Sequence, residues 1–136
     1  MVIVASDVSG GSGSDGAGVS FGGGAGSQLF NMGSIASLND RAIVNDGSDS
    51  VVWNFGDITG FVDMGDGDDT LRNASHGRFI ARGDSDFGDG EDSFINAGLV
   101  TLAPRAAPAS VTIAGLETFD NSSGGTISLQ DGQVND

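Results

Sequence analysis

Short stretches in which apolar and polar residues alternate recur along the chain. Examples are "VDM" at 62–64, "LRN" at 71–73 and "VTI" at 111–113. An alternation of this kind is typical of a β-strand that has one buried face. No window shows a sustained helical period, and no helix-capping residue precedes one. The pattern therefore predicts many short β-strands and essentially no helix.

These stretches belong to a repeat that is anchored on asparagines, each of which precedes a turn. Five anchors are separated by 23, 19, 23 and 25 residues: Asn31, Asn54, Asn73, Asn96 and Asn121. Upstream of the first four anchors lies a second recurring cell, a Gly-rich or acidic turn such as "VDMGDGDDTLRN" at 62–73. The fifth copy, "VTIAGLETFDN" at 111–121, lacks the Gly-x-Gly core. Two independent anchors in five copies indicate a stacked repeat protein.

One copy is too small to bury an apolar face alone, whereas stacked copies bury a continuous apolar column. We therefore predict an all-β fold, a parallel β-solenoid (right-handed β-helix or β-roll) of about five rungs of 19–25 residues. Residues 1–18 are interpreted as a Gly/Ser-rich lead-in, flexible or capping. Residues 19–136 are interpreted as the repeat domain, which stops in the middle of a rung and resembles a segment truncated from a longer array.

Stacking also gives the five asparagines a structural role. An asparagine at the same corner of every rung can form a ladder of amide hydrogen bonds along the column. The aromatic residues beside the asparagines are interpreted as stacked core or corner residues rather than as a binding surface: Phe30, Trp53, Phe94 and Phe119.

Composition narrows the classes of partner. The chain has 24 glycines, no cysteine, and 19 acidic residues against five arginines, which gives a net charge of −14. Nucleic acid is excluded as a partner because phosphate binding relies on Lys and Arg. Disulfides and thiolate metal sites are excluded as well. The longest apolar run, at 1–5, is too short to span a membrane. The partners expected are neighbouring rungs, other copies of the protein, and a host or surface receptor.

The acidic turns resemble the calcium-binding nonapeptide G-G-x-G-x-D-x-U-x. Residues 64–72 and 87–95 match it best, and residues 44–52 match it more loosely. Glycines let the backbone turn and aim carbonyl oxygens inward, while aspartate adds a carboxylate, and oxygen ligands suit Ca²⁺. The candidate metal ligands are Asp49, Gly65, Gly67, Asp69, Gly88, Gly90 and Asp92.

Stacked rungs would place Asp49, Asp69 and Asp92 in one column about 5 Å apart. Two carboxylates at that distance repel each other by about 1 kcal/mol in water, and by more in a less polar setting. A bound Ca²⁺ would offset this repulsion and couple metal binding to folding. The alternative is that the acids are ordinary solvated turn residues that keep the protein soluble.

The formula V-x-φ-G-x-G-x-D-T-φ-x-N-x-G-x-I is visible in "VDMGDGDDTLRN" and in "GLETFDNSSGGTI" at 115–127. It resembles the repeats in passenger regions of bacterial autotransporters and related surface adhesins, and the Gly-Asp turns resemble those of RTX-type secreted proteins. The resemblance covers about residues 19–136. It implies a right-handed β-helix or β-roll, an extracellular or cell-surface location, and a structural or adhesive role.

Catalysis finds little support in the sequence. The single histidine, His76, is interpreted as a turn residue, and "RGDS" at 82–85 is a candidate receptor ligand. We therefore expect a non-enzymatic structural or adhesive segment of a secreted or surface protein. The alternative is a β-roll whose folding depends on Ca²⁺, or a unit that assembles into a filament or surface layer.

Overall fold

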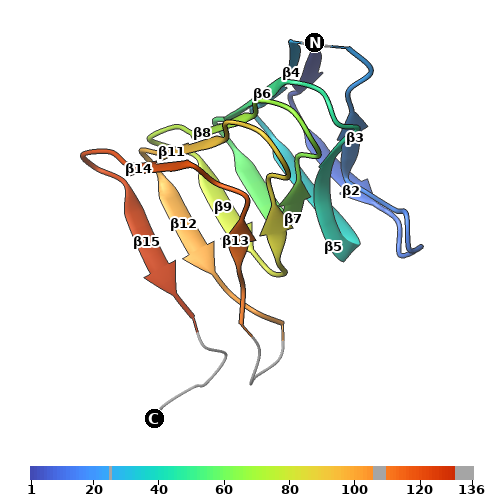
Figure 1. Cartoon of the computed structure of the whole chain (residues 1–136). Coiled ribbons are helices and arrows are strands. Elements are labelled where there is room, and N and C mark those ends of the chain that lie inside the picture. The colour runs from blue at the N-terminus through green and yellow to red at the C-terminus, as the bar shows by residue number, and fades with distance from the viewer. Residues whose placement is uncertain (25, 106–109, 131–136) are drawn as a thin grey trace.

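The computed structural model describes residues 1–24, 26–105 and 110–130, and these residues form β-strands and no helix. Strands of successive repeats lie side by side and parallel, so that the chain winds from β1 and β2 at one end to β14 and β15 at the other (Figure 1). The predicted all-β parallel β-solenoid of about five turns is confirmed. The expected truncated rung after residue 130 lies outside the described residues.

The first sheet, called sheet A here, contains the strands that end at the anchor asparagines, together with one earlier strand. All its pairings are parallel. In spatial order its strands are β1 (Val2–Val4), β4 (Ser27–Asn31), β6 (Ser50–Asn54), β8 (Thr70–Asn73), β11 (Ser93–Asn96) and β14 (Thr118–Asn121).

Sheet B forms the other wall of the column and is also parallel throughout. Strands β5 and β7 are long, and each spans a width that two short strands span in other rungs. Strand β5 pairs with both β2 and β3, while β7 pairs with both β9 and β10. The strands are β2 (Asp7–Gly10), β3 (Val19–Phe21), β5 (Ser34–Asn45), β7 (Asp57–Asp63), β9 (Arg78–Ala81), β10 (Ser85–Asp86), β12 (Leu99–Leu102), β13 (Ile113–Ala114) and β15 (Thr126–Leu129).

Residues 1–18, expected as a lead-in, contribute two strands to these sheets. Val2 pairs with Leu29 in sheet A, and Val8 pairs with Ile35 in sheet B. The stretch carries no anchor asparagine, because Val4 occupies the position of Asn31 in the register. The repeat pattern therefore gave no signal for these strands.

Two apolar columns, one from each sheet, run through the core, which also buries Ile43, Val62, Met64 and Phe87. In sheet A the alternation of the strands turns one apolar residue of each rung inward beside the asparagine, and these residues are fully buried: Leu29, Val52, Leu71 and Phe94. In sheet B the corresponding buried residues are Ile35, Ile58, Phe79 and Val100. Each rung thus buries a residue pair that it could not bury alone, which is the hydrophobic reason for the stacking.

The expectation that the aromatic residues beside the asparagines are core or corner residues is wrong for Phe30 and Trp53. Phe94 is fully buried, but Phe30 and Trp53 lie on the outer face of sheet A and are half-buried. They directly precede Asn31 and Asn54, whose side chains point inward, so strand alternation turns the two rings outward. Phe119 occupies the inner column, at its open end, and is 45% exposed.

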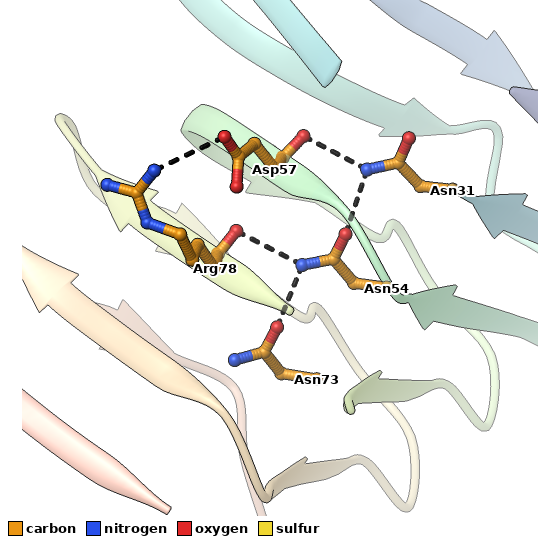
Figure 2. Close-up of polar contacts among 5 residues, drawn as sticks. All are labelled: Asn31, Asn54, Asp57, Asn73 and Arg78. Atoms are coloured by element: carbon orange, nitrogen blue, oxygen red, sulfur yellow. Dashed lines mark hydrogen bonds and ion pairs between the residues drawn. The ribbon is translucent and has the colours of Figure 1, made fainter. Parts of the chain in front are cut away.

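The predicted ladder of asparagines is confirmed. In Figure 2 the amides of Asn31, Asn54 and Asn73 point at one another from three successive rungs. Nδ2 of Asn31 donates to Oδ1 of Asn54 at 2.8 Å, and Asn54 donates in the same way to Asn73 at 2.8 Å. The ladder continues through Asn96 to Asn121 at 2.8 and 2.7 Å. The asparagines are therefore structural.

The first four amides also tie sheet A to sheet B. Nδ2 of Asn31 donates a second hydrogen bond to the carbonyl of Asp57 at 3.0 Å, and Nδ2 of Asn54 does the same to the carbonyl of Arg78 at 3.1 Å (Figure 2). Both amide protons of these buried side chains are thus satisfied. A carboxylate or an apolar residue at the same corner could not donate these two bonds.

Replacing Asn73 with leucine should destabilise the column strongly. The change removes the buried acceptor of Asn54 and one donor to Asn96, and a buried N–H left without a partner costs about 1–3 kcal/mol. We expect N73L to lower the free energy of unfolding by about 2–4 kcal/mol in urea titrations. The control is N121L, at the exposed end of the ladder, which should cost less than half as much. Equal losses in the two variants would contradict a cooperative role of the buried ladder.

Candidate functional site

The acidic turns connect sheet B to sheet A and lie one above another. Gly65, Gly67, Gly88 and Gly90 have φ angles of 74°, 118°, 84° and 153°, in the region that favours glycine. A Cβ atom on Gly88 would lie 1.9 Å from the carbonyl oxygen of Gly65, and one on Gly90 would lie 2.2 Å from that of Gly67. The glycines are therefore required both by the bend and by the close stacking of successive turns.

Asp69 and Asp92 occupy equivalent positions in neighbouring turns, because Thr70 pairs with Ser93. Their side chains are 0% and 1% exposed. Oδ1 of Asp69 accepts hydrogen bonds from the Ser50 backbone N–H at 2.8 Å and from the Ser50 hydroxyl at 2.6 Å. Oδ1 of Asp92 accepts the backbone N–H of Asp69 at 2.8 Å. Each carboxylate therefore binds the backbone of the preceding rung.

Two further members of this carboxylate ladder were missed by the sequence analysis. Ser50 stands at its start, and the backbone N–H of Asp92 donates to Oε2 of Glu117 at 2.7 Å. The nonapeptide formula does not include these positions. Counting four residues back from each anchor asparagine does find them, since it gives Ser27, Ser50, Asp69, Asp92 and Glu117.

The nonapeptide alignment predicted that Asp49 joins the column of Asp69 and Asp92, and this prediction is wrong. Val51 pairs with Thr70, which places Asp49 beside Asp68 instead. Oδ1 of Asp49 accepts the backbone N–H of Asp68 at 3.1 Å, and Oδ1 of Asp68 accepts that of Glu91 at 3.0 Å. The alignment on glycines is shifted by one residue from the register that strand pairing imposes. A second, exposed carboxylate ladder results.

Burial dominates the electrostatics of the inner ladder. Desolvation raises the pKa of Asp69 from 3.8 to about 7, against the opposing hydrogen bonds from Ser50 and with the help of the nearby Asp92 charge. Desolvation likewise raises the pKa of Asp92, with added repulsion from Glu117. Among the described residues, Oδ2 of Asp69 and Oδ2 of Asp92 have no hydrogen-bond partner. Two buried carboxylate oxygens on adjacent rungs are therefore available to bind a proton or a cation.

These orphaned oxygens are the atoms that fit a Ca²⁺ ion, since hard cations take oxygen ligands. They are only part of a full shell. Within the described ranges, no group of three or more His, Cys, Asp or Glu residues is arranged to hold a metal ion. The stacked glycines also bring the backbones of successive turns close together, as the approach of Gly88 to the carbonyl of Gly65 shows. Of the predicted ligands, Asp69 and Asp92 are the two that carry a buried side-chain oxygen without a hydrogen-bond partner in the described part of the chain.

The other candidates lie away from these turns. His76 is exposed in the turn between β8 and β9, where the N–H of Gly77 donates to the carbonyl of Ala74 at 2.8 Å. Arg82 and Asp84 of the "RGDS" stretch are exposed, and Oδ1 of Asp84 accepts the backbone N–H of Thr112 at 2.8 Å. Half of that carboxylate is therefore already engaged within the protein.

Comparison of the chain with protein-family models, with curated proteins and with solved structures finds no match. The resemblance to autotransporter passenger repeats and to RTX turns thus rests on the residue pattern. No helix of the described residues has the length and apolar character needed to cross a membrane.

The buried carboxyl of Asp69 should make stability depend on pH. Its pKa of about 7 in the folded protein lies above the ordinary 3.8, so between these values the folded state holds a proton that the unfolded state has released. Stability should therefore fall as the pH rises towards 7 and level off above it. We expect the melting temperature, measured in EDTA by calorimetry, to drop by several degrees over that range.

The variant D69N removes the titrating group and should flatten this pH profile. The matched control is D49N, since Asp49 is exposed and accepts a similar backbone hydrogen bond. It should leave most of the slope in place. If D69N and D49N have the same slope as the parent protein, the buried carboxyl of Asp69 is not its source.

Proposed function

We propose that the chain is a non-enzymatic, structural and adhesive β-solenoid segment of a secreted or cell-surface bacterial protein. The asparagine ladder and the carboxylate ladder support this proposal, because both use buried polar groups to hold rungs together. The resemblance to adhesin repeats points the same way. A column of this kind presents its outward side chains at fixed spacing, which is what a surface that contacts a partner needs.

The observation that carries the adhesive part is a strip of aromatic rings on the outer face of sheet A. This aromatic strip consists of Phe30, Trp53 and Phe55. Ring centroids are 6.2 Å apart between Phe30 and Trp53 and 6.4 Å apart between Trp53 and Phe55, with interplanar angles of 5° in both pairs. The guanidinium carbon of Arg72 lies 5.1 Å from the Trp53 ring centroid. Aromatic residues and arginine are the side chains most enriched at binding hot spots.

The strip is accessible as well as ordered. Phe55 is 46% exposed, and Phe30 and Trp53 are half-buried on strands whose inward residues are locked in the core. Rigid rings lose little conformational entropy when a partner covers them. The neighbouring Arg72 adds a positive charge to a strongly acidic protein. A polysaccharide or protein surface with apolar and anionic groups is the kind of partner that this chemistry suits.

Adhesion can be tested with beads that carry the chain, flowed over immobilised polysaccharides and extracellular-matrix proteins. We expect retention on at least one coating and a loss of severalfold or more for the variant F55S/W53S. The control L38S removes an apolar side chain that is 65% exposed but lies outside the strip. Circular dichroism verifies that each variant keeps its β signal. Absence of retention on every coating, or equal retention by both variants, would contradict the proposal.

A calcium-dependent β-roll is a second candidate, favoured by the orphaned Oδ2 atoms of Asp69 and Asp92. A cation at these atoms would neutralise charge that burial otherwise disfavours. Because the unfolded chain has no such paired site, binding there would stabilise the folded state.

Chelation tests this second candidate. We expect millimolar Ca²⁺ to raise the melting temperature by several degrees relative to EDTA, at a ratio of concentration to Kd of about 100. The variant D92N should lose this rise, whereas D7N, an exposed acid far from the turns, should keep it. Identical melting curves in calcium and in chelator would remove the candidate and leave the adhesive proposal standing.

A further inference from the structure

The two ends of the solenoid each present an unpaired strand edge in both sheets. Among the described residues, β14 pairs only with β11 and β15 only with β12, while at the other end β1 pairs only with β4 and β2 only with β5. Such an edge exposes a row of backbone N–H and C=O groups that can template another strand. Figure 1 shows these edges at opposite ends of the column.

The C-terminal end also exposes the apolar core. Phe119 and Ile127, the last described residues of the two inner columns, are 45% and 43% exposed. Between them lies an open groove of about 330 Å³ whose lining is apolar: Val100, Leu102, Ile113, Leu116, Phe119 and Ile127. In the inner rungs the same columns are covered by the next rung, whereas at this end the described residues leave the groove open.

The N-terminal end carries residues that continue both columns in register. Val2 of β1 precedes Leu29 in the sheet A column, and Val8 of β2 precedes Ile35 in the sheet B column. Both valines are half-buried. If the register is continued by one rung beyond β14 and β15, Phe119 meets the position of Val2 and Ile127 meets the position of Val8. Apolar residues therefore meet apolar residues in both columns.

The asparagine ladder is closed at this junction. Nδ2 of Asn121 donates to the carbonyl of Gly125 in its own rung at 3.0 Å, instead of to a following rung. In β1 the ladder position is occupied by Val4, which needs no hydrogen bond. In an end-to-end contact, the Asn121 amide therefore keeps its bond to Gly125, and Val4 of the second copy brings no further polar group to the ladder.

We propose that the C-terminal end binds the N-terminal end of a second copy of this chain, with β14 parallel to β1 and β15 parallel to β2. The contact is heterologous, since it joins two different surfaces, and it leaves one free end of each kind on every complex. Copies therefore add in one direction and form a filament. This self-association goes beyond the adhesive role, because it uses the ends of the column whereas the aromatic strip lies on its side.

Charge should govern the strength of the contact. Each copy carries a net charge of −14, so copies repel one another at low ionic strength. Salt screens this repulsion, while the apolar contact persists. Association should therefore increase with NaCl concentration, which is the opposite of what a contact made by salt bridges would show.

Sedimentation velocity on the full chain tests the proposal. We expect the average mass to rise above 13.6 kDa with protein and NaCl concentration. The variant I127D should block the C-terminal end and V8D the N-terminal end, so that each alone is a monomer. Mixed together, they should form a dimer and nothing larger, because V8D keeps an intact C-terminal end, I127D keeps an intact N-terminal end, and the other two ends are blocked. The control L38D should associate as the parent does.

A cross-link provides a second measurement that does not depend on core substitutions. Ile3 and Asp120 are exposed, and the continued register places them side by side across the junction. Within one chain they lie at opposite ends of sheet A, too far apart for a disulfide. Mild oxidation of I3C/D120C should therefore give covalent multimers, whereas L38C/D120C should not. A monomer at all concentrations without cross-linked multimers, or equal cross-linking of both pairs, would overturn the proposal.

Discussion

The hydrogen-bonded column of buried asparagines is the constraint on which the rest of the structure depends. Each amide needs a partner amide in the rung before it or after it, at 2.7–2.8 Å. A slip of one residue in any rung would turn its inward residues outward and leave buried amide groups unpaired. Hydrophobic contact alone discriminates less among registers that keep the same face inward, because Leu, Val and Phe substitute for one another along the same column. The ladder therefore fixes the register, and the apolar core follows it.

That register has a consequence at the acidic turns, where it forces like charges to stack. Asp69 and Asp92 cannot move apart, because each lies four residues before a fixed asparagine. The structure limits the repulsion by directing one oxygen of each carboxylate at a backbone N–H of the preceding rung. The other oxygen is left unpaired and the pKa of both groups is raised by burial. The repulsion between these buried carboxylates thus arises from the same asparagine ladder that stabilises the fold.

The sequence predicts the features that recur in every rung. It does not predict which residues pair between neighbouring strands, or which of two adjacent residues in a strand points inward. The asparagine ladder follows from the spacing of the anchors, and the structure confirms it. The alternation in "VDM" and "LRN" likewise agrees with the burial of Val62, Met64 and Leu71. Asp49 was misplaced because a motif aligned on glycines ignores the pairing of the flanking strands. Trp53 was misplaced because its neighbour Asn54, a polar residue, is the one that points inward.

The carboxylate ladder was also not predicted, because its positions do not share one residue type. Its members are Ser, Asp and Glu, which share only the ability to accept a backbone hydrogen bond, so no single-letter pattern marks them. They become visible once the anchor asparagines define the count within a rung.

The fold also separates the sides of the column from its ends. Outward residues on the sides, such as Trp53, are free to vary because the ladders and the core hold the rungs without them. The ends have no such freedom, since any strand that pairs there must continue both apolar columns in register. Side surfaces are therefore suited to evolve contacts with other molecules, whereas the ends favour a segment with the same repeat. For this reason the proposed adhesion and the proposed self-association can be altered independently of each other in this β-solenoid.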